Sequence, residues 1–453
     1  MSFDLRAIPL DATALRTLAA KGLEYRLVDT NDVAAATAWV EADFRGFHNA
    51  RPRQVSVDYD LAVIADRRVQ GVYDPSIADP AIPVATVSSW PTGLSVPGGR
   101  SVDAWAVSSV TVSPTHRRRG IARALMLAEL ENARAAGAAL AVLTASEATI
   151  YGRFGYAPAT RAATVHVDRR RTHWIGPDAP GRVHFVAAED LRTIAPALAR
   201  RAVARTTGEI DRWPGILDRA LGLVDPDSES SRRKRVVRYD DEHGNPQGFA
   251  VFQVLRDPNE HGIVEFDFLA AATDEAEREL WRFLVEQDFV TSVRGLLRSV
   301  DEPLPWLLED PRAITVSDVA DHLWVRVLDP VAALASRRYG TAGTLAIEVT
   351  DPQGHAAGLY ELVVDERGRA EVARIDPDRA SGTGTGTGSA SGSAPGIRLG
   401  VHELGAIYLG GVRPSVLARA GRVASSAASA GRAIELADRM FLGQRTPHLS
   451  IWF

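Results

Sequence analysis

The sequence contains no cysteine among its 453 residues. Disulfide bonds, zinc sites built on cysteine and a cysteine nucleophile are therefore excluded. The chain also lacks a run of about 18 apolar residues, so no transmembrane helix is expected. Its beginning has no basic flank followed by an apolar run, which argues against a signal peptide. These absences predict a cytoplasmic protein.

The sequence also has no excess of basic over acidic residues. The formal net charge of −5 is small for this length and does not indicate a nucleic-acid partner. The basic run Arg232–Arg235 has no interleaved aromatic residues, so we interpret it as a solvated loop. The 11 histidines show no metal-site spacing, and no metal is expected. We interpret His448 as a surface residue, with a place in a site as the alternative.

The sequence has enough apolar material for several packed cores. Apolar residues make up 45% of the chain and charged residues 24%, as in ordinary globular proteins. At roughly 100–200 residues per domain, the length predicts about three domains. We expect α/β domains over residues 1–168 and 169–311 and an α+β domain over 312–453. Residues 381–396 are nearly all Ser, Thr, Gly and Ala and should form a flexible loop.

The first segment alternates patterns typical of helices and strands. Apolar residues recur at i, i+3, i+4 and i+7 from Ile121, which predicts a helix over Arg119–Ala136. Gly137 follows at the point where this helix would end. The resulting β-α-β order predicts an α/β sheet. We expect a further helix at Val33–Trp39 and strands at Leu61–Ala65, Val102–Val112 and Leu140–Thr144.

A basic turn containing a glycine joins the strand at Val102–Val112 to the long helix. It contains Arg117, Arg118, Arg119 and Gly120. A glycine lets backbone N–H groups approach a ligand closely, and the free N–H groups and dipole of a helix start attract anions. The turn therefore suits a pyrophosphate, with a solvated basic helix start as the alternative. It is neither a P-loop nor a Rossmann turn, because it contains neither Gly-Lys-Ser/Thr nor Gly-x-Gly-x-x-Gly.

A second motif, Tyr-Gly-Arg-Phe-Gly-Tyr, runs from Tyr151 to Tyr156. Together the two motifs resemble the GCN5-related N-acetyltransferases (GNATs). Arg-x-x-Gly-x-Ala after a Val-x-Val strand is similar to their coenzyme A signature, and Tyr-x-x-x-Gly-Phe/Tyr is similar to the end of a helix that follows it. Within this group, the stretches Val110–Ala122 and Ile150–Thr160 resemble the actinobacterial enhanced-intracellular-survival (Eis) acetyltransferases. The total length and the three-segment layout fit the same family.

The resemblance implies two GNAT-like domains, the second degenerate, followed by a sterol-carrier-like α+β domain, and assembly as a homohexamer. It also implies acetyl-CoA as co-substrate, without a metal. The implied acceptor is a primary amine on an aminoglycoside, a polyamine or a protein lysine. Carried over position by position, the implied cofactor contacts are Val110, Thr111, Val112, Arg118, Arg119, Gly120, Ile121, Ala122, Arg123, Ser146 and Glu147.

The resemblance also implies the catalytic groups. Tyr151 takes the role of the general acid, since a hydroxyl can reprotonate the thiolate that leaves during acetyl transfer. Packing is the alternative for Tyr151, and we interpret Tyr156 as a core aromatic. The implied general base is the C-terminal carboxylate of Phe453. Four of the five residues from Leu449 to Phe453 are apolar, so we expect this end to be buried, which strengthens a carboxylate as a base. A tail that only packs is the alternative.

The acceptor pocket shows no matching motif. Asp43, Phe44, Phe47 and His48 form an acidic and aromatic group that either holds a cationic amine or simply packs. Two other interpretations of the chain stay open. It could be a lipid or acyl-CoA binding module with little turnover, because its last segment resembles lipid carriers. It could also be a regulator that binds acyl-CoA without turnover, although the presence of Tyr151 argues against this.

Overall fold

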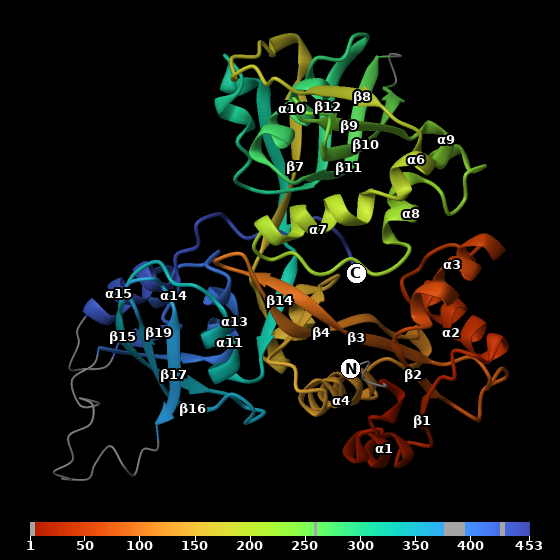
Figure 1. Ribbon diagram of the computed structural model, residues 1–453. Coiled ribbons are helices and arrows are strands. Elements are labelled where there is room, and N and C mark those ends of the chain that lie inside the picture. Colours follow the sequence, from red (N-terminus) through yellow and green to blue (C-terminus); the bar gives the residue numbers. More distant parts are fainter. Residues whose placement is uncertain (1–4, 258–260, 376–394, 426–430) are drawn as a thin grey trace. The chain divides into compact units, whose positions relative to one another are not determined.

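The computed structural model shows both units of the chain as mixed sheets with helices (Figure 1). The structure does not describe residues 381–394, which make up most of the flexible loop expected at 381–396. Among the helices described, none is long and apolar enough to cross a membrane. The described residues are 5–257, 261–375, 395–425 and 431–453.

The chain divides into two compact units. The first unit comprises residues 1–159, 323–445 and 453, and the second comprises residues 160–322 and 446–452. The chain therefore leaves the first unit after residue 159 and returns to it at residue 323.

The first unit contains a seven-stranded sheet with a parallel pair at its centre. β4 (Arg100–Val112) and β5 (Leu140–Thr144) run parallel, and α4 (Ile121–Ala135) forms the crossover that a parallel pair requires. This confirms the β-α-β order expected from the sequence. The strand order is β1 (Glu24–Leu27), β2 (Arg68–Tyr73), β3 (Ala85–Val96), β4 (Arg100–Val112), β5 (Leu140–Thr144), β14 (Leu323–Val327) and β6 (Ala157–Pro158).

Helices cover both faces of this sheet. Val72 of β2 packs in one core with α1 and α4, and Val69 of the same strand packs in another core with α2 and α3. Because side chains alternate along a strand, these two cores lie on opposite faces. The strand expected at Leu61–Ala65 is wrong, because Leu61–Ile64 form the last turn of α3 and Ala65 caps its end. The helices are α1 (Ala12–Ala19), α2 (Val33–Gly46), α3 (Gln54–Ile64), α4 (Ile121–Ala135) and α5 (Ala148–Tyr151).

The remainder of the first unit is an α+β arrangement around a five-stranded sheet. A fully buried ion pair joins it to the first sheet, since Nη2 of Arg326 in β14 lies 2.7 Å from Oδ2 of Asp351. The sheet order is β17 (Ala370–Ile375), β16 (Gly358–Val364), β15 (Gly343–Thr350), β18 (Gly396–Gly400) and β19 (Val423–Ser425). Its helices are α11 (Pro330–Ser336), α13 (Val401–Tyr408), α14 (Pro414–Arg419) and α15 (Arg432–Phe441).

The second unit repeats the plan of a parallel pair joined by a helix. β11 and β12 run parallel, and α10 connects them. The sheet order is β13 (Ile314–Asp321), β7 (Arg161–Asp168), β12 (Val290–Arg298), β11 (Gly262–Ala271), β10 (Pro246–Arg256), β9 (Arg235–Asp240) and β8 (Arg182–Phe185). The helices are α6 (Ala188–Arg192), α7 (Ala195–Arg205), α8 (Ile216–Leu221), α9 (Glu229–Arg233) and α10 (Asp274–Val285).

Near the expected domain boundaries, two strands pair with a sheet outside the segment in which the sequence placed them. β7, which ends at the expected boundary of residue 168, pairs with β12 and β13 of the second unit. β14, expected in the last segment, pairs with β5 and β6 of the first sheet. The boundaries at residues 168 and 311 stay predictions.

Residues 446–452 belong to the second unit and are held there by buried contacts. His448 is 7% exposed, and its Nε2 lies 2.8 Å from the carbonyl oxygen of Leu297. The interpretation of His448 as a surface residue is therefore wrong, because the ring is desolvated and bonded to the backbone. Leu449 and Ile451 are buried as expected, whereas Trp452 is 53% exposed.

The same tail makes stability sensitive to acid through His322. Its Nε2 hydrogen-bonds the carbonyl oxygen of Ile451 at 2.8 Å, and burial lowers the pKa of His322 to about 4. Below its ordinary pKa of about 6.5, the unfolded chain gains a proton that the folded chain does not. At pH 5 this linkage should lower the free energy of unfolding by about 2 kcal/mol relative to pH 7. Urea unfolding of His322→Gln should show a correspondingly smaller loss, and an equal loss in both proteins would contradict the assignment.

Candidate active site

β4 and β5 pair only briefly and then separate. Their pairing spans only Ala104 to Ala106 on β4, whereas β14 pairs with the full length of β5 on its other edge. β4 carries an irregularity near Ser109, whose φ is 56°, and continues alone beside β3. A strand edge exposed in this way can hydrogen-bond an extended ligand. The predicted cofactor contacts Val110, Thr111 and Val112 form this stretch of β4.

The loop after β4 presents free backbone donors at the start of α4. Arg118 and Gly120 have left-handed φ angles of 62° and 74°. The first intrahelical bond runs from the N–H of Ala124 to the carbonyl of Gly120, at 3.1 Å. The N–H groups of Ile121–Arg123 therefore precede the first helical bond, and Gly120 has no side chain that could cap them. Together with the helix dipole, this geometry suits a pyrophosphate.

The arginines of this loop have different environments. Arg118 and Arg123 are exposed, as a charge facing a polyanion requires. Arg119 instead binds other residues of the protein. Its Nη2 donates to the carbonyl of Lys21 at 3.0 Å, and its Nη1 lies 3.5 Å from Oδ2 of Asp74. Asp74 also accepts from Nε2 of buried His116 at 3.0 Å. Hydrogen bonds from Ser76 and then from His116 hold the pKa of Asp74 well below its usual range.

The start of α10 in the second unit offers no such site. The Oγ1 of Thr273 caps α10 by accepting from the N–H of Ala276 at 3.1 Å. The first turn carries three acidic residues, Asp274, Glu275 and Glu277. A filled cap and three carboxylates disfavour an anion. Only the start of α4, of these two crossover helices, is suited to a pyrophosphate.

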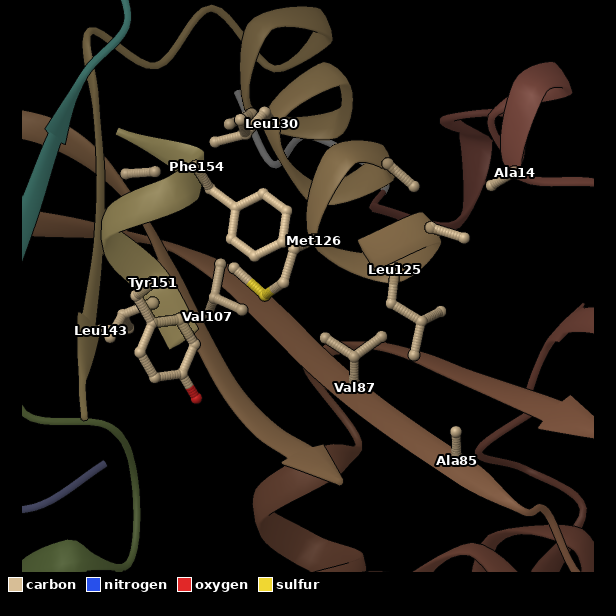
Figure 2. Packing of buried hydrophobic residues seen from close by; sticks show 14 of the residues in the cluster. Ala14, Ala85, Val87, Val107, Leu125, Met126, Leu130, Leu143, Tyr151 and Phe154 are labelled. Atoms are coloured by element: carbon tan, nitrogen blue, oxygen red, sulfur yellow. The ribbon is translucent and has the colours of Figure 1, made fainter. Parts of the chain in front are cut away.

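Tyr151 ends the short helix α5 that follows β5. Its ring is buried, with Tyr156 and Trp324 each at a centroid distance of 6.4 Å. Figure 2 shows this ring near Val107 and Leu143, with the hydroxyl pointing away from Met126. Burial, and then the charge of Glu147, raises the pKa of Tyr151 to about 12, so its hydroxyl keeps its proton at neutral pH. The predicted contacts Ser146 and Glu147 lie exposed just before α5.

Phe453 reaches the same end of β5. The hydroxyl of Thr144, the last residue of β5, donates to the main-chain oxygen of Phe453 at 2.6 Å. The N–H of Phe453 in turn donates to Oγ1 of Thr144 at 3.4 Å. The Phe453 ring meets the ring of Trp90 edge-on at 5.7 Å between centroids. The main chain of Phe453 is therefore fixed at the end of β5, and Tyr151 follows β5 on α5.

The residues predicted to hold the acceptor have different environments, and only the Asp43 carboxyl has a buried oxygen atom without a hydrogen-bond partner among the described residues. Burial, and then the charge of Asp60, raises the pKa of Asp43 to about 7. Phe44 packs against the core between α2, α3 and the sheet, whereas Phe47 and His48 are exposed. Asp43 is the member of this group that joins a buried polar cluster.

Sequence reasoning missed the residues that complete these sites. Arg67 and Trp90 lie on the α2 face of the sheet, with the Arg67 guanidinium 3.7 Å from the Trp90 ring centre. Asp74 and His116 brace the pyrophosphate loop. Arg67, Asp74 and Trp90 lie outside the motifs, so no sequence signal pointed to them. His116 lies within the stretch Val110–Ala122, but nothing there indicated its carboxylate partner Asp74.

Replacing Gly120 with aspartate should weaken acetyl-CoA binding at least tenfold, about 1.4 kcal/mol. The new carboxylate would repel the pyrophosphate and compete for the free N–H groups of α4. Gly137→Asp is the matched control, because Gly137 has the same φ of 74° at the other end of α4 and a Cβ there meets no described residue within 4 Å. Calorimetry should show loss of affinity in the first variant alone. Equal affinity in both would contradict the site.

Comparisons with known proteins agree with this architecture. Models described as acetyltransferase (GNAT) domain match residues 24–159 and 208–327, and a model described as sterol carrier protein domain matches residues 330–450. The protein is thus an N-acetyltransferase of the GNAT class, with two GNAT domains followed by a sterol-carrier-like domain. GNAT acetyltransferases use acetyl-CoA as acetyl donor.

Relatives that match most of this chain show which family within the GNAT class it belongs to. An uncharacterized N-acetyltransferase of Streptomyces avermitilis is 34% identical over 411 residues, which are 87% of this chain and 92% of the relative. N-acetyltransferase Eis of Mycobacterium tuberculosis is 32% identical over 339 residues, 73% of this chain and 76% of the relative. The crystal structure of Eis1 from Mycobacterium abscessus has a TM-score of 0.75 at 29% identity and covers 95% of this chain and 100% of its own. The chain belongs to the Eis family of N-acetyltransferases.

Proposed function

We propose that this enzyme transfers the acetyl group of acetyl-CoA to a primary amine, with Tyr151 as general acid and the carboxylate of Phe453 as general base. The observation that carries the proposal is that both residues are attached near the carboxyl end of β5. Two hydrogen bonds with Thr144 hold Phe453 there, and Tyr151 ends α5, the helix that follows β5. The proposal applies to the chain with Phe453 as its last residue.

The cofactor lies between the separated strands β4 and β5 in this proposal. Backbone groups of Val110–Val112 bind its extended arm, and the N–H groups of Ile121, Ala122 and Arg123 bind its pyrophosphate. Arg118 adds positive charge, and Gly120 allows close approach. Arg119 acts differently from its neighbours and positions the loop, since its guanidinium is bonded to Asp74 and to Lys21. Ser146 and Glu147 contact the cofactor from the start of α5.

The proposed reaction is a direct transfer. The Phe453 carboxylate takes a proton from the acceptor ammonium, and the neutral nitrogen attacks the thioester carbonyl. A C–N bond forms, the C–S bond breaks, and the electron pair leaves with the sulfur. Tyr151 supplies a proton to the departing thiolate, and the nitrogen gives up its second proton to the resulting Tyr151 phenolate. The products are an amide and coenzyme A, and the Phe453 carboxyl then releases the first proton to solvent. The raised pKa of Tyr151 keeps this proton available throughout the neutral range.

We propose that the acceptor binds on the side of α2, where Asp43 and Trp90 lie. A carboxylate and an aromatic ring are the groups that recognise an ammonium ion. An aminoglycoside, a polyamine and a lysine side chain all carry such an amine. The sequence relatives support the transfer of an acetyl group to nitrogen, since they are named N-acetyltransferases.

A lipid or acyl-CoA binding module with little turnover is the second candidate. The match of residues 330–450 to a sterol carrier protein domain favours it. A thiol-release assay with acetyl-CoA and a panel of amines separates the two candidates, with each product checked by mass spectrometry. The proposed function predicts amine-dependent release of coenzyme A and one added acetyl group per release. Tight acetyl-CoA binding without release for any amine would favour the binding module.

We propose a cytoplasmic homohexamer, as the family resemblance implies. Closed point-group symmetry is the usual form of soluble homo-oligomers. Light scattering coupled to size-exclusion chromatography should give six times the chain mass of 48.8 kDa. A monomer at micromolar concentration would refute the assembly.

A further inference from the structure

Arg67 lies opposite Trp90 in the first sheet. Arg68 of β2 pairs with Ser89 of β3 in an antiparallel register. Arg67, which precedes Arg68, therefore faces Trp90, which follows Ser89. Side chains alternate along strands, and Arg67 and Trp90 therefore share one face of the sheet. This is the face of Val69, which packs against α2 and α3.

The Arg67 side chain is a buried cation in an acidic and aromatic surrounding. The residue is 8% exposed, and its guanidinium lies 3.7 Å from the centre of the Trp90 ring. Burial lowers the pKa of Arg67 to about 10, whereas the charges of Tyr59, Asp60 and Asp43 favour its charged form. At neutral pH the guanidinium therefore remains charged beside two carboxyl groups.

This cluster borders the proposed base. The Trp90 ring contacts the Arg67 guanidinium and also meets the Phe453 ring edge-on at 5.7 Å. Asp43 shares the cluster, and its Oδ1 is buried with no hydrogen-bond partner among the described residues. A ring face flanked by carboxylates is the environment that binds an ammonium ion. Here the chain's own guanidinium occupies that environment.

We propose that Arg67 is a specificity-determining residue that fills, with the chain's own cation, the subsite where the second ammonium of a polyamine would bind. The enzyme then favours acceptors with a single cationic amine over polycations. This inference rests on the proposed function and names the acceptor class for the same site. The physical reason is charge repulsion, which a desolvated guanidinium exerts on a second cation more strongly than an exposed one does.

The wild-type enzyme supplies the first test. Hexylamine, cadaverine and spermidine carry one, two and three amines on similar chains. The value of kcat/KM should fall along this series at a fixed pH and ionic strength. A rise along the series would overturn the inference. If no amine supports release of coenzyme A, the proposed function itself fails, which is a different result.

Two substitutions supply the second test. Arg67→Met keeps an apolar stem on Trp90 and removes the charge, so the ratio of kcat/KM for spermidine to that for hexylamine should rise at least about tenfold. Arg67→Lys keeps a cation, and its ratio should stay near the wild-type value. Arg26→Met is the matched control, since Arg26 lies 4.8 Å over the Tyr73 ring with a half-exposed side chain. Arg26→Met should leave the ratio unchanged.

The readout separates specificity from folding. Loss of a merely structural arginine would lower kcat/KM for both amines and leave their ratio unchanged, and that outcome in soluble Arg67→Met would overturn the inference. Acetyl-CoA affinity, measured on each variant, reports whether the first unit is intact. If Arg67→Met does not fold, the wild-type series alone decides the question.

Discussion

Tyr151→Phe should lower kcat by about 10²–10⁴-fold while leaving acetyl-CoA affinity near the wild-type value. The substitution removes one hydroxyl and little volume, so the buried ring keeps its edge-on contacts with Tyr156 and Trp324. The departing thiolate then lacks its proton donor. Steady-state thiol release measures kcat, and calorimetry measures the affinity.

Tyr156→Phe is the matched control for this prediction. Tyr156 lies next to Tyr151 and is fully buried, and its hydroxyl has no hydrogen-bond partner among the described residues. Its loss should leave kcat within about threefold of wild type, in keeping with packing alone. Similar rates in Tyr151→Phe and wild type would assign Tyr151 to the core and remove it from the mechanism.

Adding a few residues after Phe453 should abolish most turnover without unfolding the chain. The extension moves the terminal carboxylate but leaves every side chain in place. Loss of a general base typically costs about 10²–10⁴ in rate. Deleting Phe453 should have a similar effect, because it leaves a carboxylate roughly 3.5 Å away from its place. Thiol release on protein whose terminus is verified by mass spectrometry measures both variants.

The control carries the same extra residues before Met1 and should retain full activity. Thr144→Val should lower kcat by a smaller factor, because it removes the hydroxyl that donates to the main-chain oxygen of Phe453. Full activity in the chain extended after Phe453 would eliminate the terminal carboxylate as the base.

Local patterns carried most of what the sequence predicted correctly. The spacing of apolar residues predicted α4, and the glycine-containing turn predicted the free helix start at Ile121. The strand expected at Leu61–Ala65 was wrong because a short apolar run does not distinguish a strand from the end of a helix. His448 was misplaced because a histidine gives no sign in the sequence of the backbone carbonyl it will bind.

Contacts between distant residues could not be predicted. His116 and Asp74 are 42 residues apart, and Thr144 and Phe453 are 309 apart. The position of Arg67 over Trp90 depends on the pairing register of β2 and β3, which the sequence does not specify. Strand β14 similarly joins the first sheet, although Leu323 and its partner Thr144 are 179 positions apart by the difference of their numbers, 323 − 144. Tertiary structure alone assembles these parts.

A crystal structure of the acetyl-CoA complex tests the central claim most directly. The account predicts the pyrophosphate on the N–H groups of Ile121–Arg123 and the extended arm along β4. It also predicts the thioester sulfur within hydrogen-bond reach of the Tyr151 hydroxyl, with the Phe453 carboxylate beside the acceptor position. Acetyl-CoA bound elsewhere, or a thioester remote from Tyr151, would contradict the account.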